Sequence, residues 1–380
     1  MAENKMKKFA DKYFLRSNEV LKADNLNPWV NMQVFVRKGP GKIKGIDEAI
    51  ELIINNSDIV KAGGRIYAKK EGSLYMPKET VMNIIAPIQD IVELETLYLG
   101  VIAAGTTLEN DRIDIDLNAI KRNVEQVVEL AGDRPIFYFG ARHWHYNRDR
   151  ELSETAFNGG AKDCSTDNGA EFAGKKGMGT IPHALENIYA YYYGFDNGVS
   201  KSTEAFDKFI DKNVPRIALV DYANKEITDT LKTIYTLESN GSKLNSVRVD
   251  TCGENIAEGG IEFDGRKYVT GKGVTAYAVA ELRKRLISEN KDIGIVLSSG
   301  FSNPEKVKAF NDYERETGLR LYDSIGAGFL DNARMSTADI IAIGETPDDV
   351  DYFVKGIAGK NIMHKIGRPP IYNTSLERII

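Results

Sequence analysis

The feature that most constrains the fold is an alternation of short apolar runs and amphipathic segments that begins near residue 115. Each apolar run is separated from the next by a stretch whose apolar residues recur with helical spacing. The runs that read as strands are 136–142, 216–222, 246–252, 292–300 and 321–330. Parallel strands need long crossover connections, which helices supply. This many units with short loops predicts a closed β/α barrel over residues 116–334.

The flanking segments do not follow this alternation. Residues 30–38 and 63–72 read as strands, 45–56 as an amphipathic helix, and 83–105 ends as a strongly apolar helix. This mixture predicts a separate α/β domain over residues 1–115. After residue 335 the chain is again strand-rich, which predicts that 335–380 returns to the first domain. Within the barrel, 259–271 reads as a hairpin turning at Asp264-Gly265.

Charge and composition exclude several classes of protein. A net charge of -5 argues against a general nucleic-acid surface, which needs clustered excess lysine and arginine. The only cysteines are Cys164 and Cys252, so neither a disulfide framework nor a CxxC zinc site is expected. The N-terminus has no apolar run like that of a signal peptide, and no stretch approaches 18 uninterrupted apolar residues. We therefore expect a cytoplasmic protein without a membrane partner.

Functional residues of a β/α barrel lie at the carboxyl ends of its strands. These ends carry cationic arms, carboxylates and small-residue loops: Phe139, Gly140 and Arg142, then Asp221, then Arg248 and Asp250, then Ser298, Ser299 and Gly300, then Gly326, Ala327 and Gly328. Because the ends of parallel strands share one edge, we expect these residues to meet in one site.

Two late strand ends have the composition of phosphate-binding loops. LSSGFSNPEKVKAF is a strand, a small-residue turn and a helix start, where free backbone N–H groups can bind phosphate. The sequence GAG at 326–328 lets a second stretch of backbone approach the same ligand. Each loop alone is also ordinary turn chemistry. Together, at adjacent late strands, they favour a sugar phosphate or a nucleotide.

Charged residues at other strand ends can bind the sugar and the anionic groups of such a ligand. Asp221 and Asp250 each follow an apolar strand and can hold ribose hydroxyls or Mg²⁺, although a carboxylate there also serves as a helix cap or rim ion pair. Arg142 offers a planar fork for a carboxylate or phosphate. His143 and His145 flank Trp144 and read as structural or rim residues, since no acidic metal-binding set accompanies them.

The segment GTIPHALENIY, residues 179–189, places His183 at the start of a predicted helix. Pro182 suits a helix start, and Ala184, Leu185 and Ile188 give an apolar face. From this segment alone His183 reads as a capping or packing residue.

The ordered motifs resemble a known family. FYFGAR, AFNGGAKDCS, GTIPHAL, LVDY, VRVDT, VLSSGF and IGAGFL together resemble nicotinate phosphoribosyltransferases of the short, archaeal-like branch, within the type II phosphoribosyltransferases. DKYFLRSNEVL and ELETLYLG extend the resemblance over most of the chain. Departures are AKDCS, which replaces the usual glycine and threonine before the serine, and VDTCGE, which replaces the VDSGD of the longer enzymes.

The resemblance implies an irregular β/α barrel plus an N-terminal α/β sandwich domain completed by the C-terminal segment. It implies a homodimer with active sites at the subunit interface. The implied reaction joins nicotinate to phosphoribosyl pyrophosphate, giving nicotinate mononucleotide and pyrophosphate, with Mg²⁺ as cofactor and ATP as co-substrate.

The resemblance also assigns roles to individual residues. His183 matches the histidine that ATP phosphorylates, Phe139 the aromatic that stacks on the pyridine ring, and Arg142 the arginine near its carboxylate. The remaining matches are Ser165 in base recognition; Asp221, Arg248 and Asp250 in the ribose, pyrophosphate and Mg²⁺ group; Ser299, Gly300, Gly326 and Gly328 in the 5′-phosphate loops; and Tyr13 and Phe14 as the aromatic pair that reaches a neighbouring subunit's site.

Alternatives stay open at this point. Within the family these are quinolinate or nicotinamide specificity, and GGAKDC lacks the histidine and arginine pair expected for a second carboxylate. Outside it, a sugar-phosphate-binding barrel without transferase activity remains, either an aldolase-like lyase or a regulatory sensor. An aldolase needs a strand-end lysine for a Schiff base, and none is evident.

Overall fold

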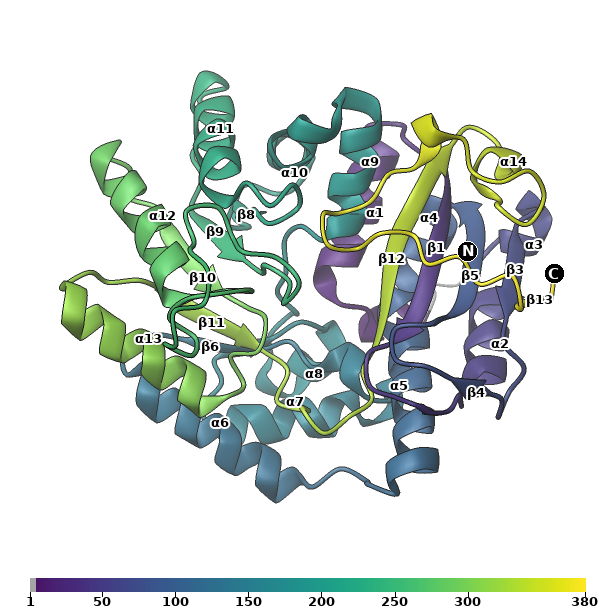
Figure 1. Ribbon diagram of the computed structural model, residues 1–380, viewed down its shortest axis with the longest axis horizontal. Coiled ribbons are helices and arrows are strands. Elements are labelled where there is room, and N and C mark those ends of the chain that lie inside the picture. The colour runs from purple at the N-terminus through teal and green to yellow at the C-terminus, as the bar shows by residue number, and fades with distance from the viewer. Residues whose placement is uncertain (1–4) are drawn as a thin grey trace.

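The computed structural model describes residues 5–380, so the first four residues of the predicted first domain lie outside the described residues. Figure 1 shows two sheets, one on each side of the molecule, joined by chain segments that cross between them. One sheet is antiparallel and the other is parallel.

The antiparallel sheet is built from both ends of the chain. In spatial order its strands are β12 (Ser336–Gly344), β1 (Trp29–Val36), β5 (Thr80–Pro87), β3 (Arg65–Ala68) and β13 (Glu377–Arg378). The central strands β1 and β5 are buried along almost their whole length, which suits their valine, isoleucine and methionine content. Both edge strands, β12 and β13, come from the C-terminal segment. A separate small hairpin pairs β2 (Gly41–Lys42) with β4 (Leu74–Tyr75).

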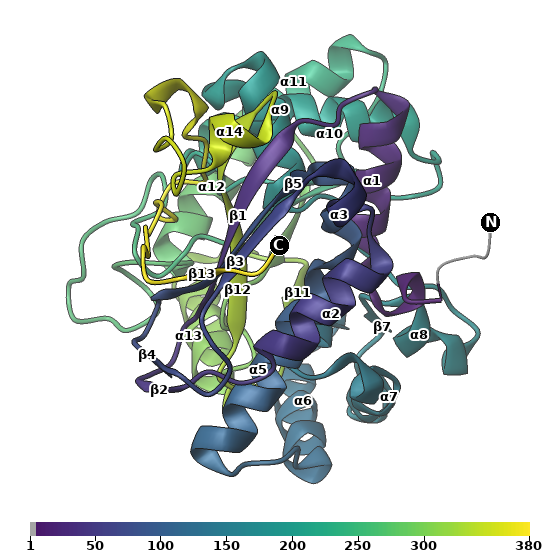
Figure 2. The same cartoon turned by 90° about the vertical axis from the view of Figure 1, so that its right-hand side faces the viewer.

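Helices from the first third of the chain cover this sheet. They are η1 (Lys7–Phe9), α1 (Lys12–Ala23), α2 (Ile46–Asn56), α3 (Ile59–Ala62), α4 (Ile88–Ile91), η2 (Val92–Leu94) and α5 (Glu95–Asp111), with α14 (Pro347–Val350) and η7 (Gly359–Asn361) added near the C-terminus. Figure 2 shows α2 lying along α5 beside the sheet. The stretch Ile88–Asp111 is long and apolar enough to cross a membrane, but 83% of its most apolar window is buried inside the protein. It therefore packs as a core helix.

The parallel sheet has six strands. Their spatial order is β7 (Asp163–Cys164), β6 (Ile136–Tyr138), β11 (Ser324–Ala327), β10 (Gly294–Leu297), β9 (Ser246–Val249) and β8 (Ile217–Leu219). Every neighbouring pair is parallel. Over residues 5–380, β7 and β8 form the two free edges and do not pair with each other. The sheet is thus a curled half-barrel, and not the closed barrel that the alternation alone predicted.

The remaining helices connect these strands. They are α6 (Leu117–Ala131), η3 (Ala141–His143), η4 (Tyr146–Arg148), α7 (Asp149–Asn158), α8 (Asp167–Ala170), η5 (Glu171–Ala173), α9 (His183–Tyr193), η6 (Phe195–Asn197), α10 (Gly198–Phe209), α11 (Glu226–Ser239), α12 (Ala276–Ser288) and α13 (Pro304–Thr317). Local chemistry sets their ends. The Asp116 carboxylate accepts a hydrogen bond from the N–H of Ala119 at the start of α6. Asn303 caps α13 in the same way, just before Pro304.

The gap in the parallel sheet has a structural cause. Between β7 and β8 the chain forms α9 and α10, and their apolar faces join the core of the antiparallel sheet. Ile181, Leu185 and Phe206 are fully buried in that core. The segment that would complete the barrel therefore packs on the other sheet, and it brings the start of α9 to the boundary between the two halves.

The predicted hairpin over residues 259–271 does not form. This fully described stretch contains a turn at Asp264-Gly265 but no paired strands. A hydrogen bond from the N–H of Gly271 to the carbonyl of Ile261 closes it as an irregular loop. Glycines with positive φ at positions 265 and 271 bend the backbone away from strand geometry.

Candidate active site

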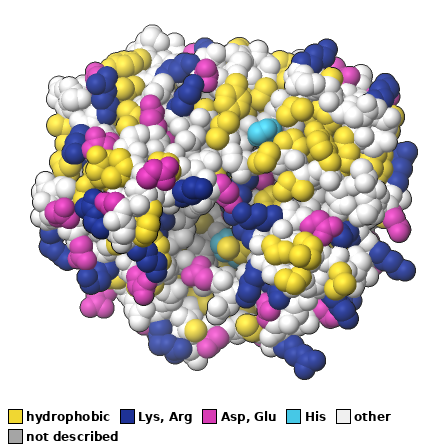
Figure 3. All heavy atoms as spheres, in the orientation of Figure 1, with side chains coloured by type: hydrophobic (Ala, Val, Ile, Leu, Met, Phe, Trp, Pro, Cys, Tyr) yellow, Lys and Arg dark blue, Asp and Glu magenta, His cyan; other side chains and the backbone are white. Residues whose placement is uncertain are grey.

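A cavity of about 320 Å³ lies between the two halves of the molecule. Figure 3 shows a hollow near the middle of this face, bordered by lysine and arginine side chains. All but one of the thirteen residues to which the family resemblance assigns roles line this cavity: Tyr13, Phe14, Phe139, Arg142, Ser165, His183, Arg248, Asp250, Ser299, Gly300, Gly326 and Gly328. Asp221 is the exception and lies behind His183.

One end of the cavity combines an aromatic ring with a guanidinium. Phe139 follows β6, and its ring packs so closely on Gly326 that a Cβ there would lie 2.1 Å from the ring. Arg142 sits three residues later in η3 and donates from Nη1 to the Tyr13 hydroxyl at 2.5 Å. The Arg142 side chain is 38% exposed, so part of its fork still faces the cavity.

Tyr13 and Phe14 line the cavity of their own chain. Both rings are buried, and the Tyr13 hydroxyl contacts Arg142 of the same chain. Their position follows from the packing of α1, whose apolar face belongs to the core of the antiparallel sheet. Their reach toward a neighbouring subunit's site stays a prediction.

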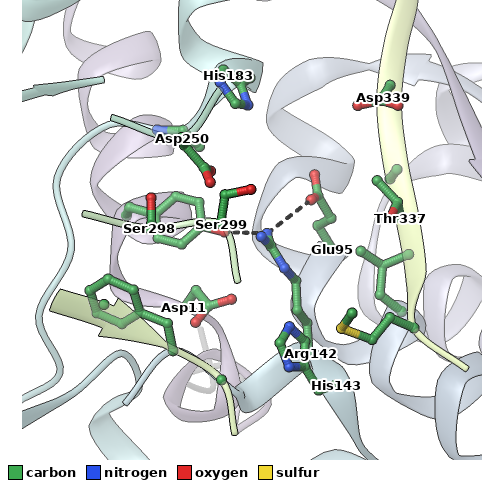
Figure 4. A pocket seen from close by; sticks show the side chains of 18 of the residues that line it. Asp11, Glu95, Arg142, His143, His183, Asp250, Ser298, Ser299, Thr337 and Asp339 are labelled. Carbon is green, nitrogen blue, oxygen red and sulfur yellow. Dashed lines mark hydrogen bonds and ion pairs between the residues drawn. The ribbon is translucent and has the colours of Figure 1, made fainter. Parts of the chain in front are cut away.

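Buried acids surround Arg142. Glu95 at the start of α5 places Oε1 3.9 Å from Nη1 of Arg142, and Asp11 and Asp339 line the same end of the cavity (Figure 4). Burial raises the pKa of Glu95 to about 8, although Arg142 opposes the shift. Glu95 lies in ELETLYLG, but no spacing or charge pattern marks it as a site residue, because it stands in a long apolar segment.

Two further polar groups at this end lack protein partners. The Ser165 hydroxyl oxygen and His143 Nδ1 are buried without a hydrogen bond. Burial, with Arg142 and Arg37 nearby, lowers the pKa of His143 to about 3, so its ring is neutral. His143 lines the cavity and is not a rim residue. His145 lies outside the cavity, and its Nε2 is 2.9 Å from Oε1 of Glu48.

His183 is held by a chain of buried charges. Its Nε2 contacts Asp221 Oδ1 at 2.9 Å, and Asp221 Oδ2 lies 2.7 Å from the ammonium of Lys365. Burial acts to raise the pKa of Asp221, but Lys365 and His183 more than compensate and lower it. Asp221 is therefore ionised, Nε2 of His183 is the donor, and the lone pair of Nδ1 is left available. The ring sits at the N-terminus of α9, where a helix stabilises negative charge.

Asp250 and Arg248 come from the end of β9. Asp250 lines the cavity beside Ser298 and Ser299 and has no hydrogen-bond or ion-pair partner within residues 5–380 (Figure 4). Arg248 reaches the Ile181 carbonyl at 3.4 Å, and its Nε is buried and unpaired. These side chains are free to contact a ligand.

The Ser298–Gly300 turn has the backbone form of an anion-binding loop. Ser299 and Gly300 both have positive φ, 71° and 82°, between β10 and the start of α13. Beneath this turn the buried ammonium of Lys306 donates to the Ser299 carbonyl at 2.8 Å. Burial lowers the pKa of Lys306 to about 8. On the neighbouring strand end, Gly328 lies against His143, where a Cβ would be 2.1 Å from the ring.

The C-terminal segment supplies residues that sequence reasoning missed. Asp339 on β12 and Lys365 and Arg368 in the following loop all line the cavity. The one available signal was HKIGR, residues 364–368, where two cations flank a glycine in a stretch without regular periodicity.

Comparison with known proteins finds similarities to phosphoribosyltransferases. Residues 11–104 match the model of the quinolinate phosphoribosyl transferase N-terminal domain. Nicotinate phosphoribosyltransferase pncB2 of Mycobacterium tuberculosis is 26% identical over 194 residues, which are 50% of this chain and 37% of that protein. Nicotinate phosphoribosyltransferase pncB1 of the same organism is 23% identical over 188 residues. The chain is similar to type II phosphoribosyltransferases. The matched part of the chain spans little more than a third of the length of those curated relatives.

Solved structures confirm the fold. The nicotinate phosphoribosyltransferase from Porphyromonas gingivalis matches with a TM-score of 0.61 at 14% identity, covering 94% of this chain and 92% of that one. The enzyme of the same name from Vibrio cholerae matches with a TM-score of 0.63 at 13% identity, covering 90% and 86%. The expected combination of an irregular β/α barrel and a sandwich domain is thus the architecture of this chain, with the barrel present as a curled half-barrel.

Proposed function

We propose that the protein is a nicotinate phosphoribosyltransferase, which joins nicotinate to phosphoribosyl pyrophosphate in pyridine nucleotide salvage. The observation that carries the proposal is one cavity with a ring-and-guanidinium end, Phe139 with Arg142, and two backbone loops suited to a phosphate, Ser298–Gly300 and Gly326–Gly328. The names of the matched curated relatives agree with it.

The reaction needs little covalent chemistry from the protein. The pyridine nitrogen lone pair forms a bond to C1′ of the ribose, and the bond from C1′ to pyrophosphate breaks, its electrons leaving with pyrophosphate. Positive charge develops on the ribose and negative charge on the leaving group, so a site needs positioned charges of both signs. Asp250 would face the ribose and Arg248 the pyrophosphate. No general base is required.

The residues present fit Mg²⁺ bound mainly through substrate. Over residues 5–380 no group of three or more His, Cys, Asp or Glu side chains forms a ready-made metal site. Mg²⁺ commonly uses one or two carboxylates together with phosphate oxygens and water. Asp250 is the unpaired carboxylate that would hold it, whereas both oxygens of Asp221 already contact His183 and Lys365. When bound, the ion would neutralise charge on the departing pyrophosphate.

We also propose that ATP phosphorylates His183, as the family resemblance implies. Asp221 fixes the ring through Nε2, so Nδ1 would be the nucleophile toward the γ-phosphorus, with ADP as the leaving group. The N-terminus of α9 would stabilise the resulting phosphoryl group.

The choice of base would come from Arg142 and Ser165. A guanidinium pairs with a carboxylate in a bidentate manner, and leaving it unpaired is costly. Ser165 can donate a hydrogen bond to a carboxylate oxygen. We therefore expect nicotinate to be preferred over nicotinamide by at least ~10²-fold in kcat/KM.

A pyrophosphate-release assay with nicotinate, nicotinamide and quinolinate in parallel tests the function. Arg142→Ala should erase much of the preference, mainly by loss of nicotinate turnover, while Arg150→Ala on the exposed face of α7 serves as the control. Equal kcat/KM for nicotinate and nicotinamide in the wild type, or a variant that still discriminates fully, would contradict the assignment.

Quinolinate is the second candidate substrate, because the matched domain model describes a quinolinate enzyme. Preferred turnover of quinolinate would select that function. Binding of phosphoribosyl pyrophosphate without pyrophosphate release from any base would instead indicate a sensor. We further propose a cytoplasmic homodimer, which light scattering and fractionation would test.

A further inference from the structure

We propose that Glu95 is a base-selecting residue: in its neutral form it leaves the Arg142 guanidinium without a competing anion and so available to a pyridine carboxylate, and in its ionised form it competes with that carboxylate. This inference rests on the proposed function and adds a residue to it. Neither the motifs nor the comparisons assign Glu95 a role.

Glu95 faces Arg142, the arginine proposed to bind the carboxylate. It is the first residue of α5 and only 6% exposed, yet it lines the cavity. Its Oε1 lies 3.9 Å from Nη1 of Arg142, which is longer than a hydrogen bond. In Figure 4 its carboxyl group and the guanidinium point toward one another across the cavity. A small rearrangement would convert this contact into a closed ion pair.

Several charged or titratable groups act on Glu95 from the elements packed around it. They are Arg142 and His143 on η3, Asp11 and Tyr13 at the start of α1, Asp339 on β12 and Tyr98 on its own helix. His143 is neutral, and Tyr13 and Tyr98 have raised pKa values because they are buried. Arg142 is thus the cation that favours ionisation of Glu95. The acids Asp11 and Asp339 disfavour ionisation of Glu95.

The sign of the effect follows from linkage. Burial holds the pKa of Glu95 near 8, so below that pH the side chain is mostly neutral. A second carboxylate bound to Arg142 would raise this pKa further, because two anions would share one cation. Binding of a carboxylated base is therefore strong below about pH 8 and weakens as pH rises through that value. Protonation of Glu95 does not strengthen binding of a neutral base such as nicotinamide.

The test measures KM for nicotinate from about pH 7 to pH 9.5 at saturating phosphoribosyl pyrophosphate, in the wild type and in Glu95→Gln. If only the neutral form binds nicotinate, the wild-type KM rises by up to about tenfold per pH unit above pH 8. Glu95→Gln keeps a neutral side chain of the same shape, so its KM should stay flat. The control is Glu93→Gln, two residues before Glu95, which removes a carboxylate paired with Lys7. This variant should keep the wild-type dependence of KM on pH.

The titration of another group can be distinguished from that of Glu95 by the substrate whose KM it changes. Lys306, with its pKa near 8, lies under the phosphate loop and would change KM for phosphoribosyl pyrophosphate instead. KM for nicotinamide in the wild type should not follow the nicotinate profile.

If Glu95→Gln does not fold, calorimetry on the wild type decides. Nicotinate binding at about pH 9 should take up close to one proton, measured in two buffers of different ionisation enthalpy.

The outcomes distinguish this inference from the proposed function. No pyrophosphate release with any pyridine base would overturn the function. Turnover of nicotinate with a flat wild-type KM, an unchanged profile in Glu95→Gln, or no proton uptake would overturn the role of Glu95 and leave the function standing.

Discussion

At the scale of single residues, the structure orients the ring of His183, because Asp221 occupies one ring nitrogen and leaves the other available for the proposed phosphorylation. We predict that His183→Ala loses ATPase activity and ATP stimulation but keeps a weak basal transferase rate, since the base and phosphate sites stay intact. The measurement is acid-labile ³²P on the protein together with pyrophosphate release. His145→Ala, which alters a histidine bonded to Glu48 outside the cavity, is the control. Wild-type ³²P incorporation by His183→Ala would contradict the prediction.

Lys365 is the second residue-scale case. It neutralises buried Asp221 at 2.7 Å, so Lys365→Met leaves an uncompensated charge and should lower the free energy of unfolding by ~3–5 kcal/mol. The double variant Lys365→Met with Asp221→Asn removes both charges and should recover a large part of that loss. Chemical denaturation of the four proteins of this cycle checks it. Additive losses in the double variant would show that the two side chains are not coupled.

Sequence reasoning found the residues whose position follows from topology. Arg142, Asp250 and Ser299 stand at strand ends, and parallel strands bring their ends to one edge, so their meeting could be expected. Glu95 and Lys365 could not be found in this way. One lies within an apolar helix and the other in an irregular loop, and their place in the cavity depends on how the two halves pack.

At the scale of elements, the end of β11 fixes the ring of Phe139. A Cβ on Gly326 would lie 2.1 Å from that ring, so Gly326→Ala must displace it. We predict a rise in KM for nicotinate of at least ~10-fold with a smaller change in KM for phosphoribosyl pyrophosphate. Gly359→Ala, where a Cβ would meet nothing within 4 Å, is the control. Equal effects on both substrates would show that the strand end, and not the ring, was disturbed.

Element prediction succeeds where helical periodicity is long. The apolar spacing of ITDTLKTIYTLES, residues 227–239, indicates a helix, which the structure has as α11 (Glu226–Ser239). The helix start read at Pro304 is the first residue of α13. Whether the barrel closes could not be predicted from the sequence, because α9 and α10 are amphipathic helices in a closed or an open barrel. Only tertiary packing places their apolar faces on the antiparallel sheet.

At the scale of the whole molecule, the C-terminal segment joins the fold to the site. It supplies both edge strands of the antiparallel sheet and, with Asp339, Lys365 and Arg368, one wall of the cavity. Residues 335–380 therefore couple the stability of the sandwich to completion of the cavity. The two proposed phosphate loops, Ser298–Gly300 and Gly326–Gly328, belong to the other half of the molecule.

This coupling gives a prediction from truncation. A chain ending at residue 334 loses β12, whose Ile340, Ile341 and Ile343 are buried, at about 1.5–3 kcal/mol for each side chain. That sum approaches the whole stability of a typical domain, so we expect no cooperative unfolding of the sandwich and no transferase activity. A chain ending at residue 375 loses only β13 and its neighbours, keeps Lys365 and Arg368, and should remain folded and active with a slightly lower Tm. Circular dichroism melts and pyrophosphate release would compare the two chains with the full protein. Cooperative unfolding at the full-length Tm in the shorter chain would show that the antiparallel sheet does not depend on its returning strand.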